Sequence, residues 1–265
     1  MKTQQNINAN IVVIVTASTL LQCIALLGLL PIAADTLGRH LFSTVEMVLV
    51  FLLLMQGWRI RQWSLQTSQD ALVQKIASLC FYSLLLCAGG DLINRNYGEQ
   101  YYQFDTLIKH SYLIQAIWFF FPGYSLIAIA NWQLSRQQVS ARSAAISVVI
   151  ALALGTLAFL SSYNPAVSRY ISSAIFLYTL MQAVMLASTV WLIKTYGWAA
   201  SCVVVIGIWL ASVADLLIGN FWIYQDHFPV IEHVNWIIYF TSLAMIQQMP
   251  FLAAGANPRN DTITQ

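Results

Sequence analysis

Long apolar stretches recur along the chain and leave it few ways to fold. Each is about 20 residues long, and short polar connections separate them. A helix of roughly 20 apolar residues is what crosses the hydrocarbon core of a bilayer. The sequence therefore predicts an all-α integral membrane protein with eight transmembrane helices in a single domain, residues 1–265. The predicted spans are 11–33, 41–58, 71–93, 104–130, 143–162, 170–193, 199–222 and 230–248.

The composition excludes a water-soluble fold. Hydrophobic residues make up 59% of the chain and charged residues 8%, whereas a soluble domain carries about 25% charge. A net charge of +2 without a basic run indicates no nucleic-acid partner. The cysteines lie in apolar stretches without CxxC spacing, so we expect buried thiols rather than disulfides or a zinc site. They are Cys23, Cys80, Cys87 and Cys202.

The charges in the connections predict the orientation. The first stretch, 11–33, is longer than the 7–15 residues of a typical signal-peptide core, so we expect an uncleaved span. With eight spans, basic residues are more frequent on the side of the termini, and the positive-inside rule then places both termini in the cytoplasm of a bacterial inner membrane. The two sides carry Lys2, Arg59, Arg61, Lys75, Arg136, Arg142, Lys194 and Arg259 against Arg39, Arg95, Lys109 and Arg169. Pro122-Gly123 predicts a kink or an early exit within 104–130.

Two segments four spans apart share polar residues at similar offsets. Asp91 is followed by Asn96 as Asp215 is followed by Asn220, and a histidine comes 19 or 18 residues after each aspartate. Segments four spans apart cross a membrane in the same direction. We therefore expect a parallel four-plus-four duplication with a pseudo-two-fold axis along the membrane normal. Its halves are 11–130 and 143–248, followed by a polar tail, 249–265.

Ionisable side chains inside the spans are the candidates for a functional site. Each costs roughly 2.5–3.5 kcal/mol at the bilayer centre and usually faces the bundle interior. The expected topology brings several of them to one level in the outer half, as the lining of a single polar cavity. Helical spacing adds three more polar side chains on the same faces. The candidates are Asp91, Asp215, Glu46, Glu232, His110 and His233, with Asn235, Tyr239 and Ser212.

Most of the candidates also have a purely structural interpretation, which fits Asp215 least because its neighbours on both sides are apolar. Asp91 lies near a helix end and fits an interfacial position, as do Glu46 and Glu232. The two histidines lie near helix starts, where partly hydrated imidazoles are common. The polar stripe of 230–248 is also typical of side chains that hold membrane helices together.

Two carboxylates in a poorly hydrated pocket favour one kind of chemistry. They cannot both ionise cheaply, so an acid stays beside an anion. Such a pair suits acid-assisted hydrolysis through a cationic transition state. The sequence has no GxSxG, Walker, HExxH or dinucleotide-binding motif, and we expect no cofactor and no metal.

Three short motifs resemble the YhhN-like lysoplasmalogenase family. They are GGD at Gly89–Asp91, KHSY at Lys109–Tyr112 and ADLLIGNF at Ala214–Phe221. These are multi-span membrane enzymes that hydrolyse the vinyl ether bond of lysoplasmalogens to a fatty aldehyde and a glycerophospho-base. The resemblance covers roughly residues 75–250 and implies a lysophospholipid substrate drawn from the bilayer.

By that likeness Asp91 and Asp215 form the catalytic pair, with His110 and Asn220 in the pocket. Family members usually carry serine before the second aspartate, where this chain has Ala214. Ser212 stands one turn back on the face of Asp215.

Other functions stay open on the same residues. A proton- or cation-coupled transporter would use the two aspartates within a duplicated bundle. A zinc-dependent amidase would use His110, His227 and His233 with a carboxylate. In a structural scaffold, Asp91→Asn and Asp215→Asn would leave every activity unchanged.

Overall fold

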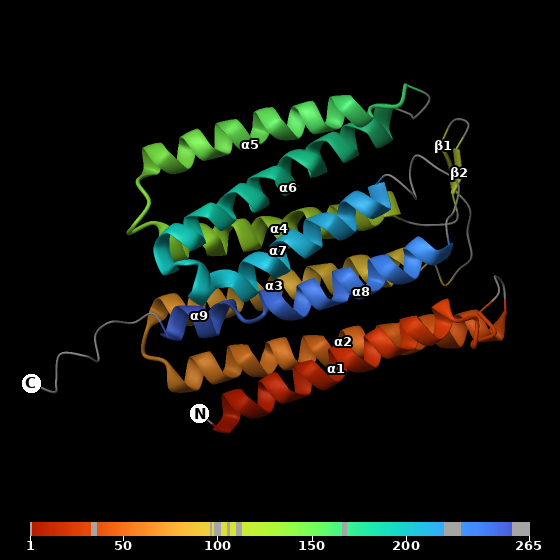
Figure 1. Ribbon diagram of the computed structural model, residues 1–265, viewed down its shortest axis with the longest axis horizontal. Helices are drawn as coiled ribbons and strands as arrows, with labels where there is room; N and C mark the ends of the chain where they lie inside the picture. The colour runs from red at the N-terminus through yellow and green to blue at the C-terminus, as the bar shows by residue number, and fades with distance from the viewer. Residues whose placement is uncertain are drawn as a thin grey trace, which may run out of the picture.

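The computed structural model describes residues 2–32, 36–95, 97, 102–104, 107–109, 113–165, 169–219 and 229–255. In these ranges long helices lie side by side along one direction and form a single bundle (Figure 1). The helices are α1 (Lys2–Leu26), α2 (Leu37–Thr67), α3 (Ala71–Asn94), α4 (Leu113–Ser135), α5 (Ala141–Ser162), α6 (Arg169–Tyr196), α7 (Trp198–Leu217), α8 (Pro229–Ile246) and α9 (Met249–Gly255).

Seven helical segments in the described ranges are long and apolar enough to cross a membrane. They are α1, α2, α3, α5, α6, α7 and the unit formed by α8 with α9. The chain is thus a multi-span integral membrane protein, as predicted. The remaining predicted span, 104–130, corresponds to α4, a 23-residue helix that is not among the seven and packs between α3 and α6.

The start of α4 differs from the prediction. Part of the predicted span 104–130 belongs instead to a hairpin in which β1 (Tyr102–Phe104) pairs antiparallel with β2 (Leu107–Lys109). Phe104 lies opposite Leu107 in this pairing. The expectation of an early exit at Pro122 is wrong, because α4 continues through this proline to Ser135.

The prediction of a polar tail over residues 249–265 is wrong for residues 249–255. Residues 249–255 form α9, which packs on α3. The side chain of Met249 is fully buried and contacts the Cys80 thiol at 3.9 Å between sulfur atoms. The reason lies in the sequence MPFLAAG, which is apolar and adds to the core.

The two ends of the bundle differ in what they carry. At one end, here called the terminal end, α1 begins at Lys2 and α9 finishes at Gly255 (Figure 1). At the other, the hairpin end, α3 and α7 finish at Asn94 and Leu217 and α8 begins at Pro229. The predicted site residues on α2, α3, α7 and α8 therefore lie toward the hairpin end.

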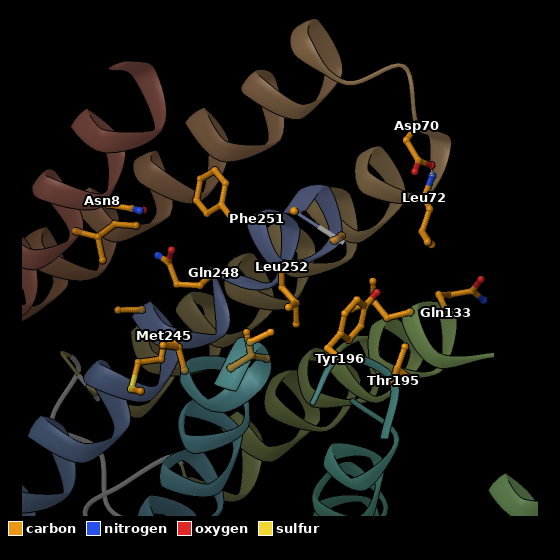
Figure 2. A pocket seen from close by; sticks show the side chains of 18 of the residues that line it. Asn8, Asp70, Leu72, Gln133, Thr195, Tyr196, Met245, Gln248, Phe251 and Leu252 are labelled. Atoms are coloured by element: carbon orange, nitrogen blue, oxygen red, sulfur yellow. Dashed lines mark hydrogen bonds between the residues drawn. The ribbon is translucent and has the colours of Figure 1, made fainter. Parts of the chain in front are cut away.

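A cavity of about 1720 Å³ lies at the terminal end (Figure 2). Its walls come from α1, the start of α3, the end of α4, the junction of α6 with α7, and α8 with α9. None of the predicted site residues that the structure describes lines it.

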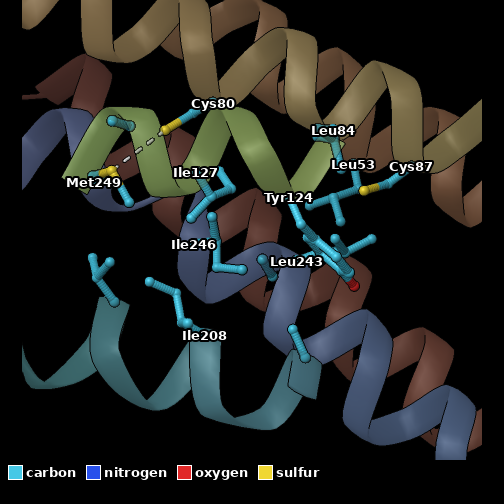
Figure 3. Packing of buried hydrophobic residues seen from close by; sticks show 14 of the residues in the cluster. Leu53, Cys80, Leu84, Cys87, Tyr124, Ile127, Ile208, Leu243, Ile246 and Met249 are labelled. Atoms are coloured by element: carbon cyan, nitrogen blue, oxygen red, sulfur yellow. Dashed lines mark hydrogen bonds between the residues drawn. The ribbon is translucent and has the colours of Figure 1, made fainter. Parts of the chain in front are cut away.

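The centre of the bundle is a close-packed apolar core. Figure 3 shows Tyr124 and Ile127 of α4 facing side chains of α3, α7, α8 and α9. The approach of α7 to α8 depends on Gly207, because a Cβ there would lie 2.7 Å from that of Met245. Small residues let membrane helices pack this closely, and this contact fixes the position of α7 beside α8.

The cysteine prediction holds for only part of the set. All four thiols are free, and Cys80 and Cys87 are buried as expected. Cys23 is exposed and Cys202 is half-buried, because an apolar residue of a membrane helix can face lipid as well as the core.

Contacts between consecutive helices repeat in the two halves, since α2 packs on α3 as α6 packs on α7, and α3 on α4 as α7 on α8. Two contacts between helices far apart in sequence do not repeat. α1 packs on α8, and α4 packs on α6. A four-plus-four duplication would pair α5 with α4 and α8 with α2 in the same way, and neither pair is among the principal contacts of the described helices. The duplication stays a prediction from the sequence.

Candidate functional site

Asp91 lies in the last turn of α3, with its side chain buried. The hydroxyl of Tyr239, from α8, donates a hydrogen bond of 2.9 Å to its Oδ2. A single turn later, the backbone N–H of Arg95 donates to the Asp91 carbonyl at 3.0 Å. Asp91 is therefore held between the end of α3 and the middle of α8.

Asp215, on α7, is half-buried and has a different set of partners. The hydroxyl of Tyr178, from α6, donates to its Oδ2 at 2.9 Å, and the side-chain amide of Gln182 donates to the same oxygen. The amide oxygen of Gln182 accepts from the Ser212 hydroxyl at 2.8 Å. Ser212 and Asp215 thus share a face of α7, as their spacing predicts, and both are tied to α6.

Aromatic rings connect the two carboxylates. The ring centroid of Phe120 lies 6.0 Å from that of Tyr239 and 6.3 Å from that of Tyr124. The ring centroids of Tyr124 and Tyr178 are 6.4 Å apart. Tyr124 is fully buried, and its hydroxyl has no hydrogen-bond partner in the part of the chain the structure describes. It stands among Cys87, Leu53 and Leu243 (Figure 3). A buried hydroxyl without a partner is rare in a native protein and marks a place for a water or a ligand.

Glu46 anchors the polar contacts around Asp91. Its side chain is 2% exposed, forms an ion pair with Arg95 and accepts from the Gln22 amide at 2.6 Å. The amide oxygen of Gln22 lies 2.6 Å from Nδ1 of His233. Because that oxygen can only accept, the proton of His233 is assigned to Nδ1.

Arg95 is also packed against an aromatic ring. Its guanidinium lies 4.2 Å from the ring centroid of Trp236, whose indole N–H donates to Ser18 at 3.1 Å. A desolvated cation over an indole face is favourable. These contacts join α1, α2, α3 and α8 through one charged and hydrogen-bonded network.

Glu232 lies at the edge of this network. It pairs with Arg39 at 2.6 Å, with 19% and 30% of the two side chains exposed, in keeping with the interfacial interpretation. The nearby Asn235 is buried and its amide oxygen has no partner among the described residues.

The sequence predicted a single polar cavity, and the hydrogen bonds instead divide the candidates between two networks. Glu46, His233, Asp91 and Tyr239 belong to the first, and Asp215 and Ser212 to the second. His110, Asn220 and His227 lie outside the described residues. Within the part of the chain that the structure describes, no group of three His, Cys, Asp or Glu side chains could hold a metal ion.

Besides Arg39, the partner of Glu232, four further partners were missed by sequence reasoning. Each is an isolated polar residue in or just beyond an apolar span, and the pairs they form are too far apart in sequence to predict. Tyr178 and Gln182, four residues apart on α6, carried a usable signal, because such spacing places both on one helix face. These four partners are Gln22, Arg95, Tyr178 and Gln182.

No protein-family model matches this chain, and no curated protein or solved structure matches it with significance. The family resemblance therefore stays a prediction from three short motifs. The fold establishes a multi-span integral membrane protein.

Proposed function

We propose that this chain is a membrane hydrolase that cleaves the vinyl ether bond of a lysoplasmalogen, with Asp91 and Asp215 as its acid and base. One observation carries the proposal. The two carboxylates lie on different helices toward the same end of the bundle, and each accepts a 2.9 Å hydrogen bond from a tyrosine hydroxyl.

The partners of each carboxylate suit a division of roles. Both tyrosines bond to Oδ2, which leaves Oδ1 of each aspartate without a hydrogen bond to the described residues. A carboxyl group fixed through one oxygen can offer the other to a substrate or a water. Like charges in an apolar interior favour one protonated and one ionised member.

The reaction needs these two states. The carboxylic acid transfers its proton to the vinyl carbon remote from the ether oxygen, and the carbon next to oxygen becomes an oxocarbenium ion. The ionised aspartate stabilises that cation and accepts a proton from the water that attacks it. The resulting hemiacetal breaks its C–O bond to the glycerol side and releases a fatty aldehyde and a glycerophospho-base.

The surroundings fit a substrate with a single tail. The rings of Phe120, Tyr124, Tyr178 and Tyr239 form an apolar wall between the carboxylates. The unpartnered hydroxyl of Tyr124 offers a hydrogen bond to an ether or water oxygen. A lipid dissolved in the bilayer can approach between helices without passing through water.

A second candidate function is proton- or cation-coupled transport. The observation that favours it is the cavity at the terminal end, opposite the aspartates. A transporter needs access from both faces, and a large opening on one side with buried carboxylates toward the other fits such a cycle.

The test is a substrate panel on purified protein. Lysoplasmalogen, its saturated alkyl-ether analogue and an ester-linked lysophospholipid are incubated side by side, and aldehyde is measured. We expect aldehyde from the vinyl ether alone, because only that bond is cleaved by protonation at carbon. Folded protein that releases no aldehyde but carries protons or cations into proteoliposomes would favour transport instead.

A further inference from the structure

The cavity at the terminal end combines polar and apolar walls. Its polar part carries glutamines from the ends of α4 and α8, together with Arg136 and Asp70. Its apolar part comes from Ile11, Val12 and Val15 of α1 and from α7 and α8. At about 1720 Å³ it exceeds the roughly 300–1,000 Å³ of typical small-molecule pockets.

One side of the cavity reaches the apolar surface of the bundle. Val12 and Val203 both line it, and they are 63% and 43% exposed. In a membrane such side chains face lipid. An apolar chain can therefore pass from the bilayer into the cavity between α1 and α7, which both pack on α8.

The charges at this end favour an anion. Arg59, Arg61, Lys75, Arg142 and Lys194 lie on helix segments near the terminal end. Arg136 lines the cavity itself and is exposed. Asp70 is the one acid in the lining, and its Oδ1 caps the start of α3 by accepting from the Leu72 N–H at 2.8 Å (Figure 2).

Two polar atoms of the lining lack partners. The amide oxygens of Asn8 and Gln133 are buried and have no hydrogen bond within the described part of the chain. Buried polar atoms are almost always paired. Both side chains are half-buried in the cavity wall, so rotation of either amide would bring its oxygen to a hydroxyl donor of an occupant.

We propose that this cavity binds an anionic glycerophospholipid from the leaflet at the terminal end. The phosphate lies by Arg136, head-group hydroxyls bond to Asn8 and Gln133, and an acyl chain runs along Val12 and Val203. This site is separate from the aspartates and does not depend on the proposed hydrolase activity.

The experiment measures lipid retained by the full chain. Protein is purified in detergent, exchanged into mixed micelles of phosphatidylglycerol and phosphatidylcholine, and the lipids that remain bound are counted by native mass spectrometry. We expect retained phosphatidylglycerol and little phosphatidylcholine. Arg136→Gln is expected to reduce retention about fivefold, because one arginine near an anionic surface contributes about 1 kcal/mol. Val203→Trp is expected to reduce retention because its indole ring blocks the path of the acyl chain.

Matched controls lie outside the cavity. Arg142→Gln removes an exposed arginine of α5 near the same end, and Val149→Trp adds a ring at an exposed valine of α5. Both retain wild-type lipid. Equal losses in Arg136→Gln and Arg142→Gln would overturn the site in favour of general surface attraction. Equal retention of both lipids, or full displacement by soluble glycerol 3-phosphate, would also overturn it.

Discussion

The hydroxyl of Tyr239 donates a 2.9 Å hydrogen bond to the Asp91 carboxylate and joins the last turn of α3 to the middle of α8. Both side chains are buried. In the proposed hydrolase this bond fixes one oxygen of the carboxyl group and leaves the other for chemistry.

Tyr239→Phe removes that bond and keeps the ring. We expect aldehyde release to fall about tenfold, because a mobile acid loses part of the 10²–10⁴-fold that positioned proton transfer contributes. Stability falls by about 1 kcal/mol, the scale of a buried hydrogen bond between membrane helices. Tyr82→Phe is the control, since Tyr82 is an exposed tyrosine of α3. Equal effects of the two substitutions would contradict a role for the bond.

Tyr124→Phe separates function from structure. The hydroxyl of Tyr124 is buried and has no partner among the described residues, so its removal relieves an unsatisfied polar group. We expect thermal unfolding to be unchanged or to move to higher temperature while aldehyde release falls. Loss of stability together with activity would indicate that the hydroxyl only supports the fold.

Glu46→Gln tests the buried ion pair. The substitution leaves the Arg95 guanidinium without its charged partner in a buried place, and breaking a buried pair costs about 3–5 kcal/mol. Glu232→Gln breaks the more exposed pair with Arg39 and is expected to cost below about 1 kcal/mol. Unfolding by heat in detergent compares the two. A smaller loss for Glu46→Gln would show that the network is not a main support of the hairpin end.

The sequence predicted the helices well, because an apolar run of about 20 residues has few alternatives in a bilayer. Helix α3, expected at 71–93, runs from Ala71 to Asn94. The hairpin β1–β2 was missed, because Phe104 and the largely apolar LIK of β2 were included in the predicted span 104–130.

The site was harder to predict than the helices. Helical spacing placed Ser212 with Asp215 on one face, since that periodicity is local. The partners of Asp215 come from α6 and lie 37 and 33 residues away in sequence. Which helices become neighbours is set by packing between spans, and a pattern within one span does not encode it.

The central claim is that both aspartates perform the cleavage, and aldehyde release by single asparagine variants tests it most directly. Asp91→Asn and Asp215→Asn keep each side chain's size but cannot exchange a proton. Asp70→Asn is the matched control, because asparagine caps a helix as well as aspartate does and Asp70 lies at the terminal end. We predict a loss of at least about 10²-fold for each of the first two and wild-type release for the third. Release that persists in folded Asp91→Asn or Asp215→Asn protein would contradict the account.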